Sequence, residues 1–98
     1  MPDSTSDPGI TLFSDLGFGD EEALNLKVRS DLMIELSQWI ENRGLTQSEA
    51  AKLFQVTQPR ISDLVRGRIE RFSVDSLIAM LGHAGAAVSF VVTPKQVA

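Results

Sequence analysis

The feature that most constrains the fold is a pair of short amphipathic segments at residues 46–67, joined by a turn of three residues. Thr46 and Glu49 have the spacing of a capping box, in which each side chain bonds a free backbone N–H at the start of a helix. Thr57 is placed to cap a second helix, and Pro59 fits its first turn because no helical acceptor is needed there. The sequence therefore predicts two short helices in succession.

Two short helices that cross near a right angle need a small residue where they touch. Ala51 in the first helix meets that need, and Ile61, ten residues later, supplies the apolar residue that packs over it. Val56 in the turn is expected to point inward. This is the spacing of a helix-turn-helix, whose second helix enters the major groove of DNA with its N-terminal part. Its predicted outer side carries Gln58, Pro59, Arg60, Ser62, Asp63 and Arg66.

Helical periodicity precedes this motif over residues 20–43. Asp20 is placed to cap the segment, and Gly44 is placed to end it. Ser30 and Asp31 can mark a break, so the segment forms either one long helix or two. Its apolar stripe consists of Leu24, Val28, Leu32, Leu36, Trp39 and Ile40.

A further helix follows the motif. Ser73 is placed to cap it, and Gly82 and Gly85 are placed to end it. Its predicted core positions are Val74, Leu77, Ile78 and Leu81. We therefore expect a mainly α fold, a helix-turn-helix bundle of four to five helices.

The C-terminal residues 87–93 read as a strand rich in β-branched residues, with Val88, Phe90 and Val92 on one face. A lone strand leaves its backbone donors and acceptors unpaired, and the sequence offers no other convincing strand, with part of residues 10–13 as the one further candidate. The economical solution is pairing with the same strand of a second copy. We therefore expect a homodimer whose interface contains these three side chains.

The N-terminal part of the chain differs in character from the rest. Residues 1–9 are polar, with two prolines and a glycine, and are predicted to be disordered. Residues 10–18 are too apolar to remain free, and they either pack onto the domain or await a partner. The expected organisation is a flexible acidic arm at 1–19, a helix-turn-helix domain at 20–85, and a dimerisation strand and tail at 86–98.

Composition excludes several classes of function. The chain has no cysteine and one histidine, which argues against disulfides, a zinc site and thiol chemistry. His83 lies near a predicted helix C-terminus, where a surface role is commoner than catalysis. We expect no enzyme activity, no metal and no cofactor. There is no apolar run of membrane-spanning length and no signal peptide, so we expect a cytoplasmic protein without a membrane partner.

The charge is distributed unevenly although the net charge is −4. Residues 1–22 carry six acidic residues and no basic one, whereas residues 43–71 carry six basic and three acidic ones. A solvated charged surface explains basic residues anywhere along a chain. Their concentration in the segment proposed to meet DNA favours a nucleic-acid partner instead.

Side-chain chemistry assigns roles within that segment. Gln58 can pair bidentately with adenine and Arg60 with guanine, so both are candidates for base readout. Asp63 either accepts from cytosine or orients Arg60 or Arg66, and we favour the orienting role. The residues expected to hold the phosphate backbone without reading sequence are Arg66, Arg68 and Arg71.

Over about residues 28–82 the chain resembles the phage-repressor-like, or XRE-type, helix-turn-helix proteins. The resemblance rests on Thr46-Gln47 and Thr57-Gln58, the pairs that open the two helices. It implies that Gln47 and Thr57 contact phosphates and that Gln58 reads a base of an operator in double-stranded DNA. Gln55 stands where the family usually has glycine, so it is expected to adopt a left-handed backbone at a modest cost.

A closer resemblance, from Leu12 to Val92, is to compact HigA-like antitoxins. It rests on the phrases LFSDLGF and QPRISDLVRGRIERFSVDSL. It implies a protein that neutralises a RelE/HigB-type ribonuclease toxin and represses its own operon. Two alternatives remain open: a stand-alone repressor of phage or host origin, and an interaction module whose helix-turn-helix no longer binds DNA.

Overall fold

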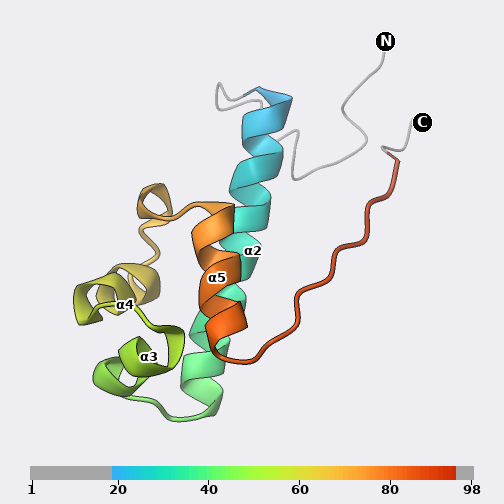
Figure 1. Cartoon of the computed structure of the whole chain (residues 1–98). Coiled ribbons are helices and arrows are strands. Elements are labelled where there is room, and N and C mark those ends of the chain that lie inside the picture. The colour runs from blue at the N-terminus through green and yellow to red at the C-terminus, as the bar shows by residue number, and fades with distance from the viewer. Residues whose placement is uncertain (1–18, 95–98) are drawn as a thin grey trace. The chain divides into compact units, whose positions relative to one another are not determined.

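The computed structural model describes residues 19–94 and is helical, as expected (Figure 1). Its elements are α2 (Asp20–Asn42), α3 (Gln47–Phe54), α4 (Gln58–Val65), the short 3-10 helix η2 (Ile69–Arg71) and α5 (Val74–His83). Residues 29–88 form one compact unit, and the packing contacts and the candidate site described below lie within it. The acidic arm and the apolar segment 10–18 lie outside the described residues.

Helix α2 is a single helix rather than two. It runs without a break through Ser30 and Asp31, because the helical backbone is continuous from Asp20 to Asn42. The cap also differs from the prediction. The carbonyl of Gly19 accepts the N–H of Ala23 at 2.8 Å, so Gly19 occupies the capping position and Asp20 is the first helical residue.

The predicted caps of α3 and α5 are confirmed. The Thr46 hydroxyl accepts the N–H of Glu49 at 3.1 Å, and the Glu49 carboxylate accepts the N–H of Thr46 at 2.9 Å. Ser73 and Ser76 make the same reciprocal pair at the start of α5. Thr57 has the extended backbone of a cap, but its side chain makes no capping hydrogen bond, so this part of the prediction is wrong.

The four α-helices between residues 19 and 94 end in the same way, with one residue of positive φ that lets the chain turn off the helix axis. That residue is Gly44 after α2, Gly67 after α4 and Gly85 after α5. After α3 it is Gln55, with φ 57° and ψ 49°, as predicted from its position where the resembled family usually has glycine. The N–H of Val56 then bonds the Ala51 carbonyl at 2.9 Å, which closes the turn between α3 and α4.

Gln55→Gly is therefore expected to raise the free energy of unfolding by about 0.5–1 kcal/mol. The left-handed backbone costs a residue with a Cβ roughly 1–2 kcal/mol, and the greater freedom of glycine in the unfolded chain offsets part of the gain. Urea denaturation of the two proteins measures the difference. Gln38→Gly, in the middle of α2, is the matched control and should instead destabilise. An equal loss of stability in both variants would contradict the expectation.

The core gathers apolar side chains from α2, α3, α4 and α5, whereas η2 contributes no buried residue. Its fully buried large members are Phe54, Leu36, Ile61, Leu64, Leu77 and Met80. The predicted stripe of α2 is confirmed at Leu32, Leu36 and Ile40, whereas Leu24 is 51% exposed. In α5 the predicted Leu77 and Leu81 are buried, and Gly82 lies within the last turn instead of ending the helix.

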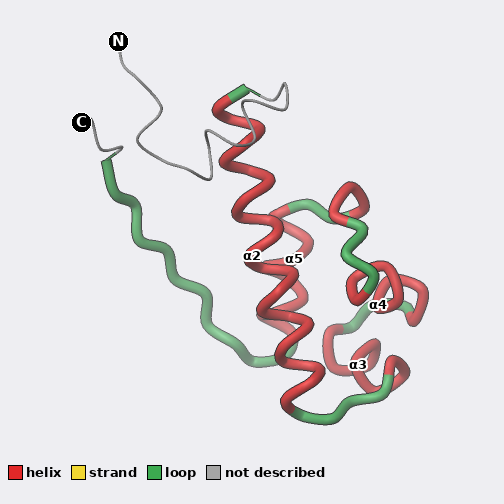
Figure 2. Tube along the Cα trace, turned by 180° about the vertical axis from the view of Figure 1, so that it is seen from behind, coloured by secondary structure: helices red, strands yellow, loops and turns green. Residues whose placement is uncertain are grey.

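The C-terminal segment has no regular secondary structure between residues 86 and 94, the last that the structure describes (Figure 2). Phe90, Val91 and Val92 are 58%, 89% and 92% exposed. The predicted strand is therefore not confirmed by the single chain. The physical reason is that a strand exists only through bonds to a neighbouring strand, and residues 19–94 of one copy supply none.

Candidate nucleic-acid interface

Helix α4 is held by its inner face. Ile61 and Leu64 have exposures of 0% and 1%, and α3 packs against both α4 and α5. Ala51, the predicted contact point on α3, is also buried, and its neighbour Ala50 is buried completely. The packing of α3 on α4 and the burial of Ala51, Ile61 and Leu64 are what the helix-turn-helix prediction requires.

The N-terminal end of α4 faces solvent. Thr57, Gln58 and Pro59 are all exposed. Because the Thr57 hydroxyl is not used as a cap, it is available to an outside acceptor or donor. The first N–H groups of a helix lack acceptors within it, and together they form a partly positive end that suits a phosphate.

Helix α3 begins in a similar setting. Gln47 is its first residue and is exposed, next to the capping box of Thr46 and Glu49. The box fixes the start of the helix, so the Gln47 side chain projects from a well-defined backbone. The predicted site residues of the two helix starts are thus exposed on both helices of the motif.

The match to known families decides what this arrangement is. A family model described as a helix-turn-helix domain matches residues 12–93, which is most of the chain. The protein belongs to the helix-turn-helix domain family. Membership indicates a DNA-binding regulator. A search of curated proteins finds no match.

Arg60 is the predicted site residue of the helix-turn-helix domain that differs most from expectation. It is half-buried instead of projecting outward. Its guanidinium lies over the Phe72 ring, 4.4 Å from the centroid, and its Nη1 donates to the Arg71 carbonyl at 2.8 Å. The arginine therefore ties α4 to the segment that follows it.

Asp63 has different partners from those predicted. It orients neither Arg60 nor Arg66 in this structure. One carboxylate oxygen lies 3.7 Å from Arg68 Nε, and the other lies 3.5 Å from Arg71 Nη1. Asp63 is therefore placed to orient arginine side chains, but these are Arg68 and Arg71 and not the predicted Arg60 and Arg66.

The remaining predicted DNA-contacting residues differ in their exposure. Ser62 and Arg68 are half-buried, whereas Arg66 is exposed and makes no ion pair with any residue between 19 and 94. Gly67 turns the chain directly after Arg66. The basic residues of the domain therefore continue past α4 into the segment 66–72.

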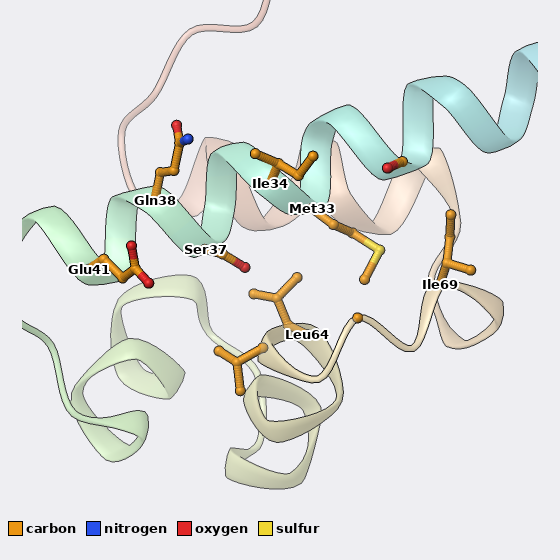
Figure 3. Close-up of a pocket in the computed structure, with 10 residues that line it drawn as sticks. Met33, Ile34, Ser37, Gln38, Glu41, Leu64 and Ile69 are labelled. Atoms are coloured by element: carbon orange, nitrogen blue, oxygen red, sulfur yellow. The ribbon is translucent and has the colours of Figure 1, made fainter. Parts of the chain in front are cut away.

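A groove of about 500 Å³ lies between α2 and the C-terminal end of α4 (Figure 3). Met33 and Ile34 of α2 and Leu64 of α4 give it an apolar lining, with Glu41 at one end. None of the predicted DNA-contacting residues lines it.

Within residues 19–94 there is no cluster of metal-ligating side chains, and no helix is long and apolar enough to cross a membrane.

Sequence reasoning missed several contacts around the site. The contact between Arg60 and the ring of Phe72 joins residues twelve positions apart, and no periodicity of the sequence indicates it. Arg29 of α2, which donates to the Ile69 carbonyl at 3.1 Å, is equally remote in sequence. By contrast, Arg43 lies 4.2 Å from the centroid of the Trp39 ring, and its helical spacing of four residues was a usable signal.

Proposed function

We propose that the protein is a non-catalytic, sequence-specific transcriptional regulator that binds operator DNA as a homodimer in the cytoplasm. The observation that carries this proposal is the arrangement of α4. Its inner residues Ile61 and Leu64 are buried, while Thr57, Gln58 and Pro59 at its N-terminus are exposed. A helix held in this way can enter a major groove without disturbing the core.

The individual contacts rest on side-chain chemistry and on the resemblance to phage-repressor-like proteins. Gln58 reads a base, for which an amide pairing with adenine is the best fit. The resemblance implies that Gln47 and Thr57, at the starts of the two helices, contact phosphates, and Pro59 lies beside Thr57 and Gln58 at the exposed start of α4. Arg66, with no ion pair among residues 19–94, contacts the backbone without reading sequence. In a dimer, two such helices lie about 34 Å apart, one turn of DNA.

Gln58→Ala is expected to weaken binding to the preferred DNA by about 1–3 kcal/mol, or roughly 5- to 150-fold. The preference at the contacted base pair should disappear as well. Fluorescence anisotropy with a selected duplex and its single-base variants measures both effects. Gln38→Ala, which removes an exposed glutamine from α2, is the matched control and should bind like the original protein. Equal affinities for the two variants would contradict the role of Gln58.

We further propose that the protein is an antitoxin of the HigA-like kind, which neutralises a RelE/HigB-type toxin and represses its own operon. Two features support this proposal. The resemblance to HigA-like antitoxins rests on the phrases LFSDLGF and QPRISDLVRGRIERFSVDSL, and the helix-turn-helix domain match covers both phrases. Residues 1–22 carry six acidic residues and no basic one, three of them in the arm 1–19 and three in the first turn of α2, and this negative charge suits a basic ribonuclease.

The toxin hypothesis has a direct test. The product of the gene adjacent to this one is expressed with and without the protein, and growth is measured. We expect growth arrest that co-expression relieves, together with a stable complex on size exclusion. An adjacent product that neither arrests growth nor binds would favour the stand-alone repressor. Deletion of residues 1–19 should abolish relief while leaving DNA binding in place.

A further inference from the structure

The segment that follows α4 is joined to it by side chains as well as by the backbone. The Arg60 guanidinium stacks on Phe72 and bonds the Arg71 carbonyl, and Asp63 lies between the guanidinium groups of Arg68 and Arg71. The backbone adds a hydrogen bond from the Arg68 N–H to the Asp63 carbonyl at 3.0 Å. Residues 66–72, named here the arginine loop, are therefore held in a fixed relation to α4.

This geometry bears on the role of Arg60. A bidentate contact to guanine needs a free pair of guanidinium donors. In Arg60, Nη1 is already engaged by a carbonyl at 2.8 Å, and the planar group is held against the buried ring of Phe72. Base readout through that edge would break the bond and disturb the stacking. These contacts favour a structural role for Arg60 within the protein over a contact with a base.

We propose that Arg60 and Asp63 are positioning residues, which fasten the arginine loop to α4 so that its three arginines meet the DNA backbone together. The inference rests on the proposed function, and it leaves Gln58 as the base-reading residue. Arg60 supplies the link through Phe72 and Arg71. Asp63, whose side chain is 21% exposed, aligns Arg68 and Arg71, and its negative charge is outnumbered by those two partners.

The salt dependence of DNA binding tests the role of Arg60. The logarithm of the affinity falls with the logarithm of salt concentration by about 0.9 for each phosphate contact. Arg60→Lys keeps the charge but loses the planar group that stacks and bonds. We expect the slope to fall by roughly 2 in this variant, because contacts of the arginine loop are lost with the link. A variant with the original slope would overturn the proposal.

Whether Asp63→Asn strengthens or weakens DNA binding tests the role of Asp63. Asp63→Asn removes a negative charge close to the DNA, so charge alone predicts tighter binding. If Asp63 positions the arginine loop, specific binding should instead weaken, by roughly three- to tenfold. Glu70→Gln, an exposed acid of the same loop, is the matched control and should bind as tightly as the original protein or slightly tighter. Tighter binding by Asp63→Asn would overturn the assignment.

A selection from a random duplex library separates the possible failures. We expect the original protein and Arg60→Lys to enrich the same sequence, with helical circular dichroism unchanged. If Arg60→Lys relaxes one base pair, Arg60 is a reader and the proposal is wrong, although the DNA-binding function stands. If the original protein enriches no sequence, the proposed function itself fails. Phe72→Leu is the second variant, and it should reproduce the reduced slope with the same preferred sequence.

Discussion

Phe54→Ala is expected to lower the free energy of unfolding by about 3–5 kcal/mol. Phe54 is the last residue of α3, has an exposure of 0%, and is among the largest side chains of the core. Its removal leaves a cavity where α3 meets its neighbouring helices. Small domains are stable by only about 5–15 kcal/mol, so the loss should bring the variant close to unfolding at physiological temperature. Urea denaturation followed by circular dichroism measures the effect.

Two further variants calibrate this result. Phe54→Leu keeps most of the volume and should cost less than the alanine variant. Ile34→Ala removes an apolar side chain that is 51% exposed on α2, and it should cost less than about 1 kcal/mol. A similar loss for Phe54→Ala and Ile34→Ala would show that Phe54 is not part of the core. Folded Phe54→Ala should also bind DNA weakly, because α3 supports α4 through this region.

The parts of the fold that the sequence predicts best depend on neighbours along the chain. The capping box of Thr46 and Glu49 is readable because its two partners are three residues apart. The left-handed Gln55 is predicted on a different ground, since the family that the chain resembles usually has glycine at this position. The burial of Ile61 and Leu64 follows from helical spacing. Local chemistry and periodicity thus place α3, α4 and the exposed start of α4.

The parts that the sequence does not predict depend on contacts between distant residues. Arg60 looks like an outward reader on a helical projection, yet Phe72 and the Arg71 carbonyl hold it half-buried. Asp63 likewise pairs with Arg68 and Arg71, at and just before η2, and no spacing rule identifies these partners. Leu24 satisfies the periodicity of α2 but is 51% exposed, whereas its neighbour Ala23 is fully buried, so the buried face at the start of α2 is not the one that the apolar stripe marks.

Removal of residues 87–98 is expected to produce monomers that bind operator DNA roughly 10²- to 10⁴-fold more weakly. The segment contains Phe90, Val91 and Val92, whose side chains are 58%, 89% and 92% exposed in the single chain. Pairing with a second copy would satisfy the backbone of the strand and cover one of its apolar faces. A monomer holds only one half-site, so the gain in affinity from two linked contacts is lost. Light scattering and fluorescence anisotropy measure the two effects.

Point variants show whether strand pairing, rather than chain length, is responsible. If Val88, Phe90 and Val92 share the buried face, Phe90→Asp should prevent dimer formation, because a charge would be buried without a partner. Val91→Asp puts the same charge on the opposite face, where it stays in water, and the dimer should survive. If the truncated protein or Phe90→Asp remained dimeric, the two copies would have to associate through another surface, and strand pairing would be excluded.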